Sequence, residues 1–481
     1  MITISATSTK GVVRGLLWLC PLVAATLAAA ATKIEPAIDG GVILVDNINL
    51  APPGAGKQGD VVFEVMPSIA LMQDSLRMKS ALNYSLQGLL YAHRSDLNGL
   101  HNAGYGNTLI VAAEDWFFVQ GQADYVQQRI DPAGASNSGN LFSSSNTTDR
   151  FDGLVAPYLF HKFGETAVLL RYSAAAERFS GGGAGSAGSL LEDANTGIST
   201  AEVGSADASR LVAWSLRGRS ARSTFETAAP FRTDLASAEA SIRVRNDLRV
   251  LGVGGSETNI TTNTVSGGLD AGFWAAGLIW TPGANQSYEV RGGHRFYGDA
   301  YSVKLNHSGR VLKMSADYSE DPTTDAQYFA LLEFVPGEID PNVGLPSTDV
   351  LRTSFEPYLR KQGNVDVALA GRRTNLTLTA YDVRRTYLAG AFAGSRDKTS
   401  GGHLALLRNL NARSSAGVSV DIASGSLRDG THYQENGYEA HYAYKVGSNL
   451  ELVARVLRID RTGNGAAYVA DVGTLILHAT F

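Results

Sequence analysis

The chain lacks covalent staples and long apolar runs. It has one cysteine, Cys20, and 14 prolines among 481 residues. If Cys20 is removed with a leader, no disulfide is available to the rest of the chain. Beyond the first thirty residues, no apolar run reaches the roughly 20 residues that a transmembrane helix requires. These absences exclude a disulfide scaffold and a bundle of membrane helices.

Glycine and aromatic residues are abundant instead, with 52 Gly, 19 Tyr and 17 Phe. Charged residues make up 18% of the chain and the mean hydropathy is -0.05. This composition fits neither a disordered chain nor an apolar helical bundle, and it favours alternating strands. The net charge is -5, and it becomes -7 when the two positive residues of the leader are lost. A negative chain of this kind argues against a nucleic-acid partner.

Residues 1–31 have the pattern of a secretory signal peptide. Lys10 and Arg14 form a basic segment, residues 15–27 an apolar one, and Ala28 to Ala30 offer small-residue cleavage sites. We therefore expect one mature domain, residues 32–481. Cys20 offers a lipoprotein alternative, but bulky residues precede it where lipid attachment needs small ones.

The last stretch, residues 468–481, alternates with a period of two. Leu475, Leu477 and Ala479 point to one face, and residues 474, 476, 478 and 480 point to the other. A soluble β-sandwich could end in the same way. The rest of the chain must therefore decide between a sandwich and a transmembrane barrel.

Residues 76–90 favour the barrel, because even-numbered positions are mostly apolar while the odd-numbered face carries Arg77 and Lys79. Each cation would cost about 2–4 kcal/mol against lipid near the midplane, so this face should line a water-filled lumen. Similar alternation occurs at residues 117–128, 287–297, 310–320 and 438–446, whereas the phase of 225–231 and 365–388 stays open.

The predicted connections alternate between short and long, as in outer-membrane barrels with tight periplasmic turns and long extracellular loops. The short ones are residues 73–75, 114–115, 162–164, 218–221, 246–247, 282–286, 308–309, 374–375, 409–411 and 447–448. Long ones include 47–60, 129–148, 180–206 and 321–363. The sequence thus predicts an all-β, antiparallel up-and-down barrel of about 22 strands. Phe481 should close it against a first strand at 33–46, which leaves no room for a plug domain before that strand.

The longest predicted loop, residues 321–363, has an apolar middle at 328–335. A freely solvated loop would be more polar, and long loops without structure are usually functional. We expect this segment to fold inward or against the rim and to narrow the pore.

No catalytic or metal-binding motif stands out. Residues 183–188 match a glycine-rich dinucleotide pattern without its strand and helix context, which favours a flexible loop. The nine His are scattered, so the sequence predicts no metal site and no cofactor. We expect no enzyme, although a catalytic triad scattered in sequence leaves a hydrolase inside the barrel as an alternative.

The candidate functional residues are charges on the predicted inner face, because rings of charge in a pore select permeants. The alternative is that they pair across strands and select nothing. These candidates are Arg77, Lys79, Asp124, Arg171, Glu289, Arg291, Arg295, Lys304, Lys313 and Asp317, with Asp421 and Glu439 nearby. The terminal Phe481 is the candidate signal for barrel assembly.

Several stretches resemble the PEP-CTERM system-associated outer-membrane β-barrel proteins, a family found with exopolysaccharide and exosortase genes. They include KIEPAIDGGVILVDNINLAP, AEDWFFVQGQADYVQQRI and PYLRKQGNVDVALAGRRTNLTLTAYDVRRTY. The resemblance covers nearly all of residues 32–481 but contains no catalytic motif and transfers no functional residue. It implies a barrel in the outer membrane, in contact with lipid and the barrel-assembly machinery, that serves surface polysaccharide production or protein sorting. Extracellular polysaccharide and its export proteins are then expected partners. A nutrient porin and a non-conducting scaffold remain alternatives.

Overall fold

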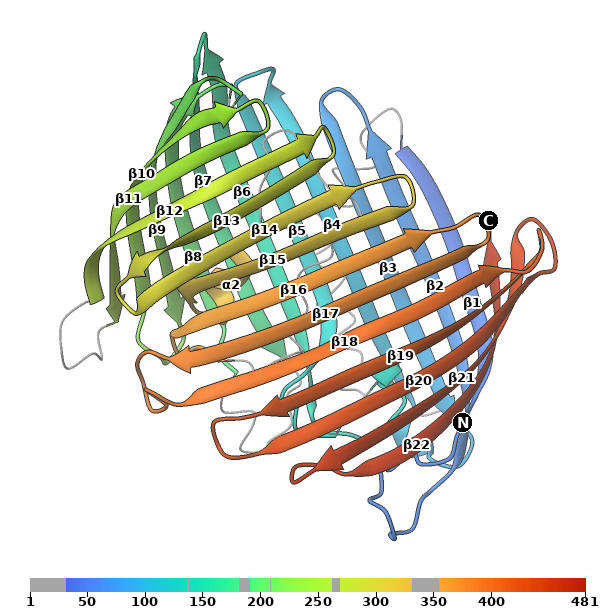
Figure 1. The fold of residues 1–481 in the computed structure, drawn as a ribbon. Coiled ribbons are helices and arrows are strands. Elements are labelled where there is room, and N and C mark those ends of the chain that lie inside the picture. The colour runs from blue at the N-terminus through green and yellow to red at the C-terminus, as the bar shows by residue number, and fades with distance from the viewer. Residues whose placement is uncertain (1–31, 136–137, 181–190, 208, 262–268, 331–353) are drawn as a thin grey trace.

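The computed structural model describes residues 32–481 apart from 136–137, 181–190, 208, 262–268 and 331–353. The described residues form one antiparallel sheet of 22 strands (Figure 1). The first eleven are β1 (Thr32–Val45), β2 (Asp60–Asp74), β3 (Met78–Tyr91), β4 (Gly99–Ala113), β5 (Phe117–Arg129), β6 (Thr147–Phe163), β7 (Thr166–Ser180), β8 (Ala194–Ser205), β9 (Val212–Phe225), β10 (Phe231–Arg245) and β11 (Leu248–Thr261). The others are β12 (Leu269–Gly283), β13 (Gln286–Arg295), β14 (Gly298–Ser308), β15 (Leu312–Thr323), β16 (Tyr358–Ala370), β17 (Thr374–Tyr387), β18 (Arg396–Asn409), β19 (Ser414–Ser426), β20 (His432–Lys445), β21 (Leu450–Gly463) and β22 (Tyr468–Thr480).

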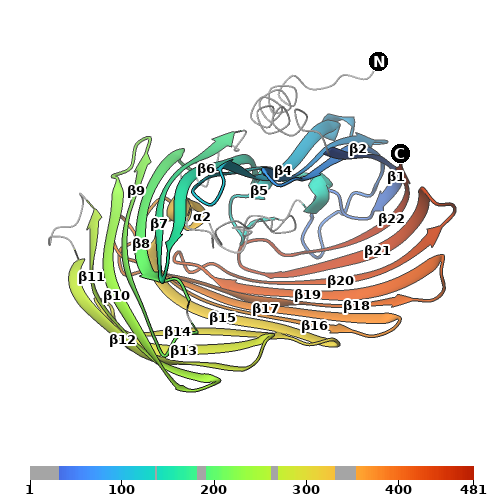
Figure 2. The ribbon, with the colours of Figure 1, turned by 90° about the horizontal axis from the view of Figure 1, so that it is seen from above.

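The sheet closes on itself. β1 pairs with β2 and also with β22, from Ala37 opposite Thr480 to Val45 opposite Val472. Closure removes the free edges that lipid could not satisfy with hydrogen bonds. The predicted all-β barrel is therefore confirmed, and Figure 2 shows it from above as an elongated, indented ring. Among the described residues, no helix is long and apolar enough to span a membrane.

Alternation along the strands separates an outer from an inner face. Leu44 on β1, Trp274 on β12 and Val456 on β21 are 56, 59 and 61% exposed and belong to the outer, apolar face. Their immediate neighbours along each strand belong to the inner face, because successive side chains of a strand point in opposite directions. The outer face is thus suited to lipid, and the inner face carries most of the polar side chains.

Connections after even-numbered strands are short and those after odd-numbered strands are mostly longer, as predicted. Three predicted connections fall on strands. The expected turn 374–375 begins β17, and the turn of that hairpin is at 371–373. Residues 218–221 form no turn but lie inside β9, and the expected loop 180–206 contains β8. β8 consists largely of Gly, Ala, Ser, Thr and Asn, so it shows no strong apolar alternation. The short connection between β8 and β9 comprises residues 206–211, of which 208 lies outside the described residues.

Two ladders stop before their strands end. β4 and β5 pair only from Ala113 opposite Phe117 to Gly104 opposite Tyr125. β14 and β15 pair only from Ser308 opposite Lys313 to Val303 opposite Tyr318. Beyond these points β5 still pairs with β6, and β15 still pairs with β16. The hairpins β5–β6 and β15–β16 therefore part from the preceding strand at the end of the barrel that carries the longer connections.

Candidate functional site: the lumen and its two crossing segments

One predicted lumen residue is misplaced. Arg77 lies in the exposed turn between β2 and β3, whose first residue is Met78. The Ser75 hydroxyl donates to the Met78 carbonyl at 3.0 Å and accepts the Met78 N–H at 3.1 Å, which closes the turn before the strand begins. The predicted strand start at residue 76 is therefore wrong by two residues. Arg77 stands at the rim of the barrel instead of on its inner wall.

The other predicted charges lie on the inner face by strand register. Arg291 on β13 contacts Glu239 on β10 at 2.8 Å. Its side chain crosses Gly277, where a Cβ would stand 3.0 Å from Arg291 Cγ. Arg295 contacts Glu257 on β11 at 2.6 Å and Asp321 on β15 at 3.1 Å. These two arginines pair across strands, as the alternative to a selective ring predicts. Glu289 belongs with these pairs, because its carboxylate lies 2.5 Å from Arg291 Nε.

The remaining predicted charges are more dispersed. Arg171 on β7 donates to Gln120 Oε1 on β5 at 3.4 Å. Asp317 on β15 accepts from Asn364 Nδ2 on β16 at 3.1 Å. The others occupy inner-face positions on their strands, and these are Lys79 on β3, Asp124 on β5, Lys304 on β14 and Lys313 on β15. The structure does not bring the predicted set together into one ring.

A short helix, α2 (Asp325–Ala330), follows β15 and enters the lumen (Figures 1 and 2). Phe329 and Ala330 pack against apolar inner-wall residues of β6 to β9, namely Leu154, Ala156, Ala175, Ile198 and Ala221. Gln327 Nε2 donates to the Phe231 carbonyl on β10 at 3.3 Å. One side of α2 thus rests on the wall formed by β6 to β10.

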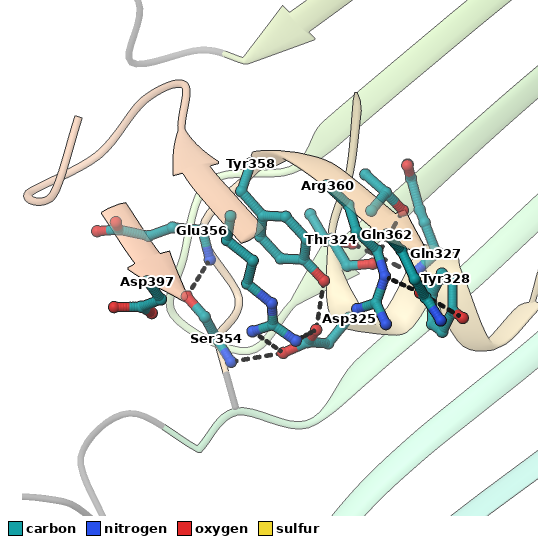
Figure 3. Close-up of polar contacts among 12 residues, drawn as sticks. Thr324, Asp325, Gln327, Tyr328, Ser354, Glu356, Tyr358, Arg360, Gln362 and Asp397 are labelled. Carbon is teal, nitrogen blue, oxygen red and sulfur yellow. Dashed lines mark hydrogen bonds and ion pairs between the residues drawn. The ribbon is translucent and has the colours of Figure 1, made fainter. Parts of the chain in front are cut away.

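The other side of α2 is held by the wall of β16 and β17. Figure 3 shows Tyr358 and Ser354 directed at the Asp325 carboxylate. The Arg385 guanidinium on β17 donates to both Asp325 oxygens, at 2.7 and 3.3 Å. Both partners are almost fully buried, with 1% and 2% of their side chains exposed. A buried charge is tolerated only when it is paired and hydrogen-bonded, which this carboxylate is.

A second segment also crosses the lumen. This segment, the inner loop, comprises residues 130–146 between β5 and β6, described apart from 136 and 137. Leu141 and Phe142 join the buried cluster of Val62, Leu89 and Tyr468 on strands β2, β3 and β22. Ser143 N–H donates to the Ile48 carbonyl at 3.0 Å. The inner loop therefore leaves β5 and packs against the wall around the β1–β22 closure.

The other end of the inner loop is held by charge. Arg461 on β21, 1% exposed, donates to the Pro132 carbonyl and contacts Glu435 on β20. Arg129 at the end of β5 contacts the same Glu435 at 3.6 Å. Ala133 packs between Leu427 and Tyr433.

The sequence predicted inward folding for one of these segments only. That prediction is confirmed for the part that falls on 328–330, while residues 331–335 lie outside the described residues. Asp321 and residue 363 belong to β15 and β16, so the connection is shorter than expected. Thr324 lies directly before α2 and caps its start, because the Gln327 N–H donates to Thr324 Oγ1 at 3.2 Å. A threonine at this place is a local sequence signal for the start of a helix. No sequence signal pointed to Asp325, Arg385, Arg461 or Glu435.

Among the described residues, no group of three or more His, Cys, Asp and Glu side chains is placed to hold a metal ion. The lumen offers instead polar walls and two segments that side-chain contacts hold across it. This arrangement can admit, bind or exclude a polar molecule.

No family model matches the chain, and no curated protein matches it. Among solved structures, the FrpB iron transporter from Neisseria meningitidis is similar over 95% of this chain and 83% of its own, with a TM-score of 0.52 and 8% identity. The ferric enterobactin receptor PfeA from Pseudomonas aeruginosa (TM-score 0.46, 9% identity, 94% and 81% covered) is less similar. So is OccK2 from the same species (TM-score 0.36, 7% identity, 93% and 98% covered). At these identities the likeness concerns the fold alone. The closed sheet of 22 strands with its apolar outer face is that of a large outer-membrane β-barrel.

Proposed function

We propose that this protein is a gated conduit of the outer membrane and that its cargo is extracellular polysaccharide. The observation that carries the conduit is the pair of segments, α2 and the inner loop, that cross a polar lumen. Each is fixed to the far wall by a few side chains and not by a strand ladder, so each can leave the lumen without opening the barrel. The fold shared with an iron transporter supports passage, and the sequence resemblance alone supports the polysaccharide.

A nutrient porin is the second candidate, because a polar inner wall suits any small hydrophilic solute. A non-conducting scaffold is the third. In each case the protein is expected not to be an enzyme. Phe481 follows β22 with its side chain 76% exposed, while its N–H donates to the Pro36 carbonyl at 3.0 Å. An exposed terminal ring beside the closure is available to the barrel-assembly machinery, which we propose as a partner together with outer-membrane lipid.

A clean gene deletion tests these alternatives. Secreted polysaccharide and the permeability to small solutes are measured side by side in the deletion strain and in a complemented one. Lost polysaccharide with normal permeability supports export, and lost permeability with normal polysaccharide supports a porin. Loss of neither rejects both conduits and leaves the scaffold.

Charge reversal sharpens the test at the inner wall. Lys79→Glu together with Lys313→Glu changes two exposed inner-face cations, whereas Arg77→Glu changes a cation in the turn and serves as the matched control. We expect the double variant to reduce release of polysaccharide at an unchanged amount of folded barrel. An equal fall in release and in folded barrel would assign these lysines to folding alone.

A further inference from the structure

Four cations gather on the wall formed by β16, β17 and β18, which lie side by side in Figure 1. Lys361 of β16 stands opposite Arg384 of β17, and Arg384 stands opposite Lys398 of β18. Arg396 lies two residues before Lys398, so its side chain points the same way. We call these four residues the basic cluster. Three neighbouring strands thus place their cations next to each other.

The direction of the side chains assigns the basic cluster to the outer face. Lys361 lies an even number of residues from Val365 on β16, and Arg384 lies an even number from Leu378 on β17. Val365 and Leu378 are both 39% exposed and belong to the apolar outer face. Side chains two residues apart on a strand point the same way. Because Lys398 stands directly opposite Arg384, it shares that face.

Along the strands, the basic cluster lies just beyond the apolar outer belt. Val365 is the last exposed apolar residue of β16 on the way to Lys361. Between them is Gly363, which stands opposite Tyr318 of β15, and the tyrosine ring lies 3.5 Å from where a Cβ of this glycine would be. Tyrosine rings favour the headgroup level of a bilayer. The cations, one row nearer the end with the longer connections, are therefore at the level of lipid head groups.

Among the described residues, two carboxylates contact the basic cluster. Glu320 of β15, 2% exposed, contacts Lys361 Nζ at 3.0 Å. The carboxylate of Asp382 on β17 is shared, because it lies 2.7 Å from Arg384 Nε and 3.6 Å from Lys398 Nζ. Four cations thus meet two carboxylates, and the cluster keeps a surplus of positive charge.

A cation opposite a cation is an unfavourable arrangement in a sheet, because like charges directly across a ladder destabilise it. On the β21–β22 wall, Arg458 stands opposite Asp471 and contacts it at 3.3 Å, which is the favourable pairing. In the basic cluster both direct pairs are repulsive. An anion bound over the three strands would replace this repulsion with attraction. Neighbouring strands lie about 4.8 Å apart, so one anionic head group could reach all three.

Phosphate is the anion that suits both the cations and their place in the membrane. The guanidinium fork binds phosphate through two parallel hydrogen bonds, and a lysine ammonium adds a point charge. Clusters of about four or more Lys and Arg beside a membrane attract anionic lipids. The exposed apolar residues Val365, Leu378 and Leu404 continue from the cluster toward the middle of the belt, where acyl chains lie.

We infer that the basic cluster is a binding site for a phosphorylated lipid in the leaflet on the side of the longer connections. Its phosphate lies over the cations of β16 to β18, and its acyl chains lie on the apolar residues of the same strands. The proposed function treats lipid only as the surroundings of the barrel, whereas this inference assigns one lipid class to one site. It does not depend on the cargo of the conduit.

Native mass spectrometry of the whole barrel in detergent tests the site. Three probes are compared, namely dioleoyl phosphatidic acid, dioleoylglycerol, which has the same chains without phosphate, and inorganic phosphate. We expect phosphatidic acid to bind about tenfold or more tightly than dioleoylglycerol, because charge-assisted contacts to phosphate are added to the apolar ones. Inorganic phosphate at the same concentration should not displace it, because it lacks the acyl chains.

Two substitutions remove the surplus charge of the cluster. Arg396→Gln together with Lys398→Gln leaves both carboxylates of the cluster paired, and this double variant should bind phosphatidic acid about tenfold more weakly. The matched control is Arg217→Gln together with Arg455→Gln, which removes two cations that are 55% and 40% exposed on the inner face. The control should bind phosphatidic acid as the unchanged barrel does.

Four results would overturn the site. Equal binding of phosphatidic acid by the double variant and the unchanged barrel is the first. An equal loss in the inner-face control is the second, since net charge alone would then attract the lipid. Equally tight binding of dioleoylglycerol would exclude recognition of phosphate, and displacement by inorganic phosphate would indicate a site for a free anion. If the double variant fails to fold, the comparison of the three probes in the unchanged barrel still decides.

Discussion

The two segments that cross the lumen are fixed in opposite ways. In α2 the buried carboxylate of Asp325 takes hydrogen bonds from Arg385, Tyr358 and the Ser354 N–H, while Phe329 and Ala330 pack on the opposite wall. The inner loop has two separate anchors, an apolar cluster around Leu141 and a charged contact through Arg461. The polar contacts around Asp325 depend on a single charge, so one substitution removes them together, whereas the apolar and the charged anchors of the inner loop can be lost only one at a time. The difference suggests that α2 moves first.

Removing the Arg385 charge should have the largest effect. Arg385→Met leaves Asp325 buried without its counter-charge, which costs about 3–5 kcal/mol. With Cys20→Ser and a reporter at Ala326→Cys, which is 3% exposed, maleimide labelling should speed up by about 100-fold or more, since about 1.4 kcal/mol is tenfold. Arg384→Met is the matched control, because Arg384 is exposed and pairs with Asp382 on the outer side of the same strand. Equal rates in the two variants would show that the ion pair does not hold α2.

Shortening the apolar anchor of the inner loop should have a smaller effect at its far end. Leu141→Ala removes about 2–3 kcal/mol from the cluster, near the low end for such changes, because neighbours can collapse into the space. The Pro132–Arg461 contact remains, so a reporter at Ala133→Cys, 1% exposed, should label less than tenfold faster. Leu44→Ala, on the outer face of β1, controls for general loosening. A hundredfold rise would mean that the loop leaves as one unit, and the contrast with α2 would fail.

Salt should produce the smallest change and should separate the two anchors. Raising ionic strength from 0.1 to 1 M shortens the screening length from about 10 to about 3 Å. The Arg129–Glu435 contact, 20% and 23% exposed, should weaken by less than about 1 kcal/mol, so labelling at position 133 rises a few-fold at most. Labelling at position 326 should stay constant because the Asp325–Arg385 pair is buried. A larger response at 326 than at 133 would reverse the assignment.

The sequence predicted the barrel well where apolar and polar residues alternate strictly, as in β3 and β22. It missed β8, whose small residues pack without a strong apolar pattern, and it placed Arg77 inside because a turn closed by Ser75 leaves no trace in the alternation. The inner-face positions of residues such as Arg291 followed from period two alone. Their partners did not, because Arg291 reaches Glu239 over two intervening strands.

The contacts that hold the two crossing segments could not be predicted from the sequence. Asp325 and Arg385 are 60 residues apart, and the hydrogen bond between Arg461 and Pro132 spans 329 residues. Nothing local distinguishes such residues from ordinary surface charges. Only the closed barrel brings the opposite walls near enough for one side chain to bridge them.

The pairing of β1 with β22 governs how this molecule is made. Asp39 and His478 contact each other across that pair and are separated by 439 residues. Bringing residues so far apart in the chain together costs much conformational entropy, so we expect this pair to form late in folding. Until then the chain is an open sheet, and its first and last strands can each pair with a strand of another protein. The time spent in that state grows with the number of strands that must form before the ends can meet. We therefore expect the rate of barrel closure, more than the stability of the closed barrel, to limit the yield of this protein. We also expect cellular factors to bind the free edges of β1 and β22 until these strands pair.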